Sequence, residues 1–107
     1  MEERIAKITT ADLGVEDHGI FTSLIDLDYG GGGQGIPGYD LRGPLAAPYI
    51  RAVMAACGVD RWSKVQGRTV LALTENGMVA GLKPLPTETG KPVIFADLAA
   101  TVTGKAT

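Results

Sequence analysis

The sequence predicts an α+β fold: a single small domain with a mainly antiparallel sheet of about five strands and one helix packed on a face. A length of 107 residues suits one domain. Apolar side chains recur at helical spacing in one stretch, residues 48–57, whereas several short stretches are rich in β-branched and aromatic residues. We expect residues 1–98 to form the globular domain and residues 99–107, which are small and polar, to form a flexible C-terminal tail.

The first half of the chain predicts two antiparallel strands. Residues 4–9 contain a short strand, and residues 20–29 contain the stretch with the strongest β preference. Between them, the polar segment bracketed by Gly14 and Gly19 is typical of a loop that joins antiparallel strands. After a glycine-rich stretch, residues 39–41 are expected to resume a strand.

The predicted helix covers Pro48 to Cys57. Pro48 suits the first helical position because its missing N–H would have no partner there, and Gly58 supplies a left-handed stop. Cys57 lies on the apolar face, where it is expected to be a small core residue. A helical turn capped by Asp60 follows, and we expect it to hold Trp62 against the core.

The last third of the sequence predicts a hairpin and a final strand. Residues 68–74 and 78–82 flank Asn76-Gly77, the pair favoured in a tight type I′ turn. A proline-containing loop then leads to residues 92–98, which are expected to form the last strand.

Composition excludes several classes of protein. A lone cysteine cannot form an internal disulfide, and one histidine with one cysteine cannot make a zinc site of the usual kind. No apolar run approaches the length of a membrane span, and the N-terminus lacks the pattern of a signal peptide. We therefore expect a cytosolic protein that does not contact membranes.

The charges are unevenly distributed along the chain. Residues 8–41 contain six acids and no Lys or Arg, whereas residues 42–91 contain seven bases and three acids. The simpler interpretation is that the two segments pack together and their surface charges interleave. The alternative is a dipolar surface that steers a charged partner or favours self-association. Neither segment is basic enough to predict general binding to duplex nucleic acid.

The glycine cluster at residues 30–38 contains a literal G-x-G-x-x-G, but no helix begins inside it, so we reject a dinucleotide site. Six glycines in nine residues lose unusual backbone entropy on folding. One interpretation is a bulge or crossover packed against another backbone; the other is a loop whose bare N–H groups contact a ligand or partner. A phosphate among the nearby acids would need Arg42 or Arg51 folded over it. The candidate binding residues are Asp17, His18, Tyr29, Gly31, Gly33, Gln34, Gly35, Tyr39 and Arg42.

Glu16, Asp17 and the only histidine, His18, adjoin one another in the first loop. The histidine could act as a general base, and the carboxylates could bind a hard cation such as Mg²⁺ together with Asp26 or Asp28. The other interpretation is a polar turn in which Asp17 caps backbone N–H groups. Because no nucleophile or second base can be assigned, we name no catalytic residue, metal ligand or cofactor.

A series of short motifs resembles small uncharacterised proteins encoded by phages and prophages. The motifs are Glu16-Asp17-His18-Gly19-Ile20, Leu27-Asp28-Tyr29-Gly30-Gly31-Gly32, Gln34-Gly35 and Gly38-Tyr39, followed by Cys57-Gly58-Val59 and Trp62. The resemblance spans residues 7–73 and carries no assigned activity. This chain has Ile36-Pro37 where the family pattern has Phe-Gly, so recognition at that point can differ.

The resemblance implies a phage accessory protein in the host cytoplasm, of a class that often acts on host machinery. The leading hypothesis is a self-associating, non-enzymatic, anti-defence binding protein that uses the glycine-rich loop. It would sequester a nucleotide-like signal or cap a host protein. Two alternatives stay open: a small metal-assisted hydrolase built on Glu16, Asp17, His18 and Asp28, and a virion or assembly component.

Overall fold

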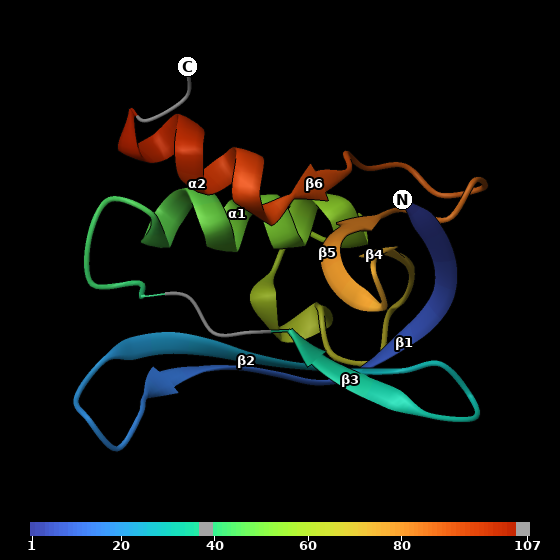
Figure 1. Cartoon of the computed structure of the whole chain (residues 1–107), viewed down its shortest axis with the longest axis horizontal. Helices are drawn as coiled ribbons and strands as arrows, with labels where there is room; N and C mark the ends of the chain where they lie inside the picture. Colours follow the sequence, from blue (N-terminus) through green and yellow to red (C-terminus); the bar gives the residue numbers. More distant parts are fainter. Residues whose placement is uncertain (37–39, 105–107) are drawn as a thin grey trace.

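The computed structural model describes residues 1–36 and 40–104, and within them six strands form one antiparallel sheet in the order β3-β2-β1-β4-β5-β6. Two helices lie side by side over one side of this sheet (Figure 1). The predicted α+β class, with a mainly antiparallel sheet in one small domain, is confirmed, with six strands and two helices instead of five and one. The strands are β1 (Glu2–Val15), β2 (Phe21–Asp28), β3 (Gly33–Ile36), β4 (Thr69–Glu75), β5 (Met78–Lys83) and β6 (Val93–Ile94); the helices are α1 (Ala46–Cys57), α2 (Phe95–Thr103) and the 3-10 turn η1 (Trp62–Lys64).

β1 changes partner along its length. Its first part, Glu2 to Lys7, pairs with β4, and the part from Lys7 to Val15 pairs with β2. A register shift between Ile8 and Thr10 marks an irregularity at this exchange. Irregularities of this kind bend a strand and increase its twist, so the sheet curls. The β2–β3 end of the sheet therefore comes close to β5.

The core lies between the concave face of the sheet and α1. Tyr49, Val53 and Ala56 of α1 are almost completely buried, as are Ile8 of β1 and Leu82 of β5. α2 packs on α1, and the ring centres of Tyr49 in α1 and Phe95 in α2 lie 5.7 Å apart. Burial also raises the pKa of the Cys57 thiol to about 11, consistent with the predicted core position.

The predicted hairpin is confirmed. Asn76 and Gly77 both have positive φ, 53° and 79°, as a type I′ turn requires. The predicted stop at Gly58 is also found, with φ of 67°. The helix, however, begins at Ala46 rather than Pro48. Pro48 is then the third helical residue, where a backbone N–H still has no partner within the helix.

Two local predictions are wrong. The strand expected at residues 39–41 is absent at Asp40 and Leu41, while Tyr39 lies outside the described residues; the third strand instead forms within the glycine cluster, at Gly33–Ile36. Asp60 does not cap a turn. Its carboxylate accepts a hydrogen bond from Lys64 Nζ, and the residue before η1 is Arg61. Trp62 nevertheless packs against the core and donates to the Ala11 carbonyl, as expected.

The end of the chain also differs from the prediction. Residues 92–98 were expected to form a strand and residues 99–107 a tail, but only Val93 and Ile94 are in a strand and Phe95–Thr103 is helical. Alanines at positions 96, 99 and 100 favour a helix. Phe95, which is 3% exposed and packs against Tyr49 of α1, holds the start of this helix in place. Residues 105–107 lie outside the described residues. No helix in the described chain is long and apolar enough to cross a bilayer.

Candidate functional site

The glycine-rich loop is a tight turn between β2 and β3. The Asp28 carboxylate accepts a hydrogen bond from the Gly30 N–H at 2.7 Å, and the Tyr29 N–H donates to the Gly32 carbonyl at 2.7 Å. Gly30 has a φ of 98°, a conformation that side chains rarely adopt. The turn therefore begins with one glycine that the backbone geometry demands.

A hollow of about 430 Å³ opens beside this turn, and we call it the glycine hollow. It forms because the curled sheet brings together the start of β1, the β2–β3 turn and the β4–β5 turn, which lie far apart in the sequence. Its walls are Arg4, Tyr29, Gly31, Gly32, Gly33, Gln34 and Gly77.

Arg4 supplies the positive charge of the glycine hollow. Its guanidinium carbon lies 4.2 Å from the centre of the Tyr29 ring, which is a cation–π arrangement. Within residues 1–36 and 40–104, no carboxylate forms an ion pair with Arg4. Burial raises the pKa of Tyr29, with Arg4 acting weakly in the opposite direction, so the phenol stays protonated near neutral pH. The hollow thus presents a charged guanidinium stacked on a neutral aromatic ring.

The glycines of the loop differ in how strongly the fold requires them. A Cβ at Gly33 would lie 2.6 Å from the Leu27 carbonyl oxygen, and one at Gly35 would lie 3.2 Å from a carboxylate oxygen of Asp26. At Gly31 and Gly32, by contrast, an added Cβ meets nothing within 4 Å, and neither residue has a positive φ. Close packing therefore explains why residues 33 and 35 are glycines. Neither packing nor backbone conformation explains why residues 31 and 32 are glycines.

Gln34 connects the two ends of the curled sheet. Its amide oxygen accepts hydrogen bonds from the Tyr29 hydroxyl at 3.3 Å and from the Val79 N–H at 3.2 Å. Its amide nitrogen donates to the Met78 sulfur at 3.2 Å. Gln34 lines the hollow, and its polar atoms are already engaged with Tyr29 and with β5.

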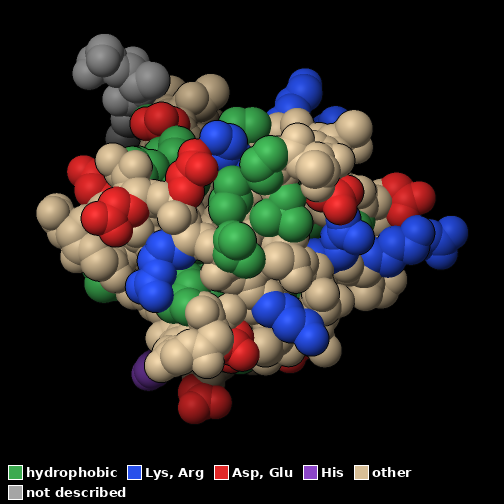
Figure 2. Space-filling view, turned by 90° about the vertical axis from the view of Figure 1, so that its right-hand side faces the viewer, with side chains coloured by type: hydrophobic (Ala, Val, Ile, Leu, Met, Phe, Trp, Pro, Cys, Tyr) green, Lys and Arg blue, Asp and Glu red, His purple; other side chains and the backbone are tan. Residues whose placement is uncertain are grey.

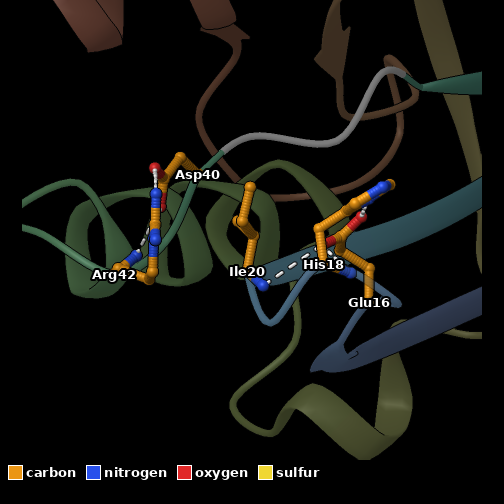
Figure 3. A network of polar contacts seen from close by, with 5 residues as sticks. All are labelled: Glu16, His18, Ile20, Asp40 and Arg42. Carbon is orange, nitrogen blue, oxygen red and sulfur yellow. Dashed lines mark hydrogen bonds and ion pairs between the residues drawn. The ribbon is translucent and has the colours of Figure 1, made fainter.

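The Glu16–His18 segment is a capped turn at the opposite end of β2 (Figure 3). One carboxylate oxygen of Glu16 accepts hydrogen bonds from the backbone N–H groups of His18 and Ile20 at 2.7 and 3.2 Å. The other oxygen lies 3.0 Å from His18 Nδ1, and these bonds lower the pKa of Glu16. The capping residue is therefore Glu16, not the expected Asp17, which is exposed and makes no hydrogen bond within the described part of the chain.

His18 and Arg42 do not reach the glycine hollow. The His18 side chain is 84% exposed, and eight strand residues, at ~3.3 Å each, separate its turn from the glycine-rich loop. Arg42, which lies near the same turn, donates its guanidinium N–H groups to both carboxylate oxygens of Asp40, at 3.0 and 2.7 Å (Figure 3). The predicted site residues thus separate into two groups, with Tyr39 outside the described residues.

The metal-assisted hydrolase is not assembled in the described chain. Asp28 lies at the far end of β2 from Glu16 and His18, and its carboxylate is occupied by the Gly30 N–H. Among residues 1–36 and 40–104, no three His, Cys, Asp or Glu side chains are grouped as a metal site.

Sequence reasoning missed Arg4 and a second hollow. Arg4 lies in the same register of β1 as the buried Ala6 and Ile8, so an arginine at a core-facing position was a usable signal. The second hollow, of about 790 Å³, adjoins the end of α1 and has three cations on its wall, Lys64, Arg68 and Lys91. Lys64 is paired with Asp60, and the Arg68 guanidinium lies 3.8 Å from Glu88, so two of these charges are partly neutralised.

Comparisons of the chain with protein-family models, with curated proteins and with solved structures find no significant match.

Proposed function

We propose that the protein is a binding protein that holds a small phosphate-bearing, nucleotide-like ligand in the glycine hollow. The observation that carries the proposal is the position of Gly31 and Gly32: they line the hollow beside Arg4, and neither packing nor backbone conformation requires glycine there. Bare backbone allows a ligand to approach N–H groups closely, and glycine-rich turns use this to bind anions.

The positive charge of Arg4 can offset the repulsion that the nearby carboxylates exert on a phosphate bound at this loop. Asp26 and Asp28 flank the turn, and an anion would be repelled unless a cation covered it. Of the two cations expected from the sequence, Arg42 is held by Asp40 and Arg51 is exposed on α1, and neither lines the hollow. Arg4 faces the hollow without a carboxylate partner in the described residues. A planar base could extend over the Arg4–Tyr29 pair, since guanidinium and aromatic faces both stack.

The biological setting of the proposal rests on the motif resemblance to phage-encoded proteins. A phage protein that sequesters a nucleotide signal would act against a host defence response without catalysing a reaction. It needs affinity and abundance only, and this accords with a hollow that presents a cation and open backbone.

Binding is tested by titrating the protein with cyclic mono- and dinucleotides, linear nucleoside phosphates and inorganic phosphate, using calorimetry and thermal shift. The variants Gly31→Ala and Gly32→Ala should weaken binding of the active compound at least about tenfold, because the methyl group occupies the hollow. Their stability should be unchanged or about 0.4–1 kcal/mol higher. Gly43→Ala is the matched control, since Gly43 is equally open and lies in the segment before α1, outside the hollow's lining.

Arg4→Gln tests the charge of the hollow separately. Losing a charge-assisted hydrogen bond of about 1.5–3 kcal/mol should weaken binding roughly ten- to a hundredfold. Arg51→Gln, an exposed arginine of α1, should leave the affinity unchanged. If no nucleotide or phosphate compound binds, or if the control variants lose as much affinity as the hollow variants, the proposal is wrong.

Capping of a host protein is the second candidate, and the position of β3 favours it. β3 lies at one edge of the sheet, so an extended partner segment could pair with it through main-chain hydrogen bonds. A partner that binds the wild-type protein, when that protein ignores every nucleotide, would favour this candidate.

A further inference from the structure

The outer face of the β1–β4 half of the sheet carries an apolar surface separate from the core. Ile5 of β1 stands opposite Leu71 of β4, and Glu3 stands opposite Leu73. Leu71 and Leu73 are 7% and 8% exposed, yet neither belongs to the core cluster under α1. Ile5 is 66% exposed. We call Ile5, Leu71 and Leu73, together with the neighbouring Ile94, the outer apolar patch.

The fold places these side chains together by strand alternation. Arg4 and Ala6 point toward the inner side of the sheet, so Glu3, Ile5 and Lys7 point outward. Gly81 lies beside Leu73 in β5, and a Cβ there would lie 3.0 Å from the tip of Ile94, which therefore extends the patch toward β6. Figure 2 looks onto the side of the molecule where β1 begins and shows a group of hydrophobic side chains surrounded by charged ones of both signs.

Ile5 lies between an acidic and a basic residue of β1, each two positions away along the strand. Glu3 precedes it by two residues and Lys7 follows it by two, so both lie on the same face of β1. Glu3 also accepts a hydrogen bond from Lys83 Nζ at 2.8 Å. Lys7 is exposed and forms no ion pair within residues 1–36 and 40–104. An exposed isoleucine thus lies between a carboxylate that is shared with Lys83 and an ammonium group that forms no ion pair in the described chain.

We propose that the outer apolar patch binds a second copy of this chain, forming a two-fold symmetric dimer centred on Ile5. A two-fold axis that lies in the interface perpendicular to β1 reverses the strand direction in the second copy. Glu3 then faces Lys7 of the second copy, and Lys7 faces its Glu3. An axis parallel to β1 would instead place Glu3 against Glu3, so the charges select the antiparallel arrangement.

A second copy fits this surface better than a partner of other chemistry because the surface complements itself. Each copy contributes the isoleucine that the other copy must cover, and both ion pairs form in one symmetric step. Sheets pack face to face through such apolar side chains at a spacing of about 10 Å. This inference does not depend on the proposed function, since the patch lies on the face of β1 opposite Arg4.

The oligomeric state tests the proposal. Light scattering after gel filtration and sedimentation velocity, from about 1 to about 100 µM protein, should show a dimer for the wild type. Ile5→Asp should be monomeric throughout, because it buries two aspartates against each other. Leu24→Asp, at an exposed leucine of β2 (53% exposed), is the matched control and should stay dimeric. A wild type that is monomeric at every concentration, or an Ile5→Asp variant that remains a dimer, would overturn the proposal.

A charge exchange tests the arrangement within the dimer. Glu3→Lys and Lys7→Glu should each weaken dimerisation by about tenfold or more, because each places like charges opposite one another. The double variant Glu3→Lys, Lys7→Glu should dimerise more tightly than either single variant but less tightly than the wild type, because the exchange also breaks the Glu3–Lys83 ion pair within each copy. Circular dichroism of each variant reports whether the monomer is folded. Folded single variants with unchanged dimer affinity, or a double variant weaker than both, would contradict the antiparallel geometry.

Discussion

At Asp40, one arginine sets the charge state of a carboxyl group. Hydrogen bonds from the Arg42 side chain, and then from its backbone N–H, lower the pKa of Asp40 from 3.8 to about 2. A carboxyl whose pKa is lower in the folded chain stabilises it above the unfolded pKa. That contribution is therefore present above pH 3.8 and is lost as the pH falls toward 2.

Arg42→Gln should raise the pKa of Asp40 toward 3.8, since the main cause of the shift is removed while the backbone bond remains. An NMR titration that follows the Asp40 carboxyl carbon measures this directly. Arg51→Gln, on an exposed face of α1, should leave the value near 2. An Asp40 pKa that is the same in the wild type and in Arg42→Gln would contradict the assigned cause.

Residues that are neighbours in the sequence could be assigned to the site, whereas residues brought together by the fold could not. Tyr29 and Gln34, which the sequence names as candidate binding residues because they adjoin the glycine-rich loop, both line the glycine hollow. His18 was grouped with them because of the motif pattern, although the length of β2 keeps the two ends apart. Arg4 could join the site only through the curl of the sheet, which depends on contacts between distant segments.

At the scale of elements, the pairing of β3 with the far end of the sheet depends on Gln34. The Val79 N–H lies beside the register shift of the β4–β5 ladder, and the Gln34 amide oxygen accepts its hydrogen bond. Val79 is 7% exposed, so water replaces this acceptor poorly.

Gln34→Leu should therefore lower the free energy of unfolding by about 1–3 kcal/mol, the cost of leaving a buried N–H without a partner. Urea unfolding followed by circular dichroism measures the change. Met78→Leu removes the sulfur that accepts from Gln34 but keeps the apolar volume of a half-exposed residue, and should change stability by less than about 0.5 kcal/mol. Equal effects of the two substitutions would mean that Gln34 does not hold β3 to β5.

The elements that sequence reasoning found are those with strong local signals. The Asn76-Gly77 turn and the Gly58 stop need positive φ, and only a few residue types supply it. β3 and α2 were missed because their local signals point elsewhere. Glycines weaken a strand, yet Gly33 and Gly35 pair with β2; Val93, Ile94 and Phe95 favour a strand, yet contact with α1 continues the chain as a helix.

At the scale of the whole molecule, ion pairs between the two charged segments are few in the part of the chain that the structure describes. In the described chain, the one ion pair between an acid of residues 8–41 and a base of residues 42–91 joins Asp40 to Arg42, two positions apart. The predicted interleaving of the surface charges thus involves, in the described chain, no ion pair between distant parts of the two segments. The uneven distribution of charge along the sequence accords with association guided by charge.

The first half of β1 contributes to the glycine hollow on one face of the sheet and to the outer apolar patch on the other face. Arg4 faces the glycine hollow, Ile5 belongs to the outer apolar patch, and residues 2–6 are hydrogen-bonded to β4 on one side only. A strand segment that is hydrogen-bonded to one neighbouring strand unfolds locally more easily than a segment that is hydrogen-bonded to two. Covering Ile5 with a second copy should therefore hold Arg4 more firmly in the hollow.

If both proposals hold, the nucleotide and the second copy should strengthen each other's binding. The monomeric variant Ile5→Asp should bind the nucleotide about two- to tenfold more weakly than the wild-type dimer, and saturating nucleotide should tighten the dimer by the same factor for each site. Calorimetry and sedimentation velocity measure the two halves of this relation, with Leu24→Asp as the control that keeps wild-type values. Hydrogen exchange at residues 2–6 should slow on dimerisation and again when the nucleotide binds. Equal nucleotide affinities for monomer and dimer, with unchanged exchange, would show that the two sides of β1 act independently.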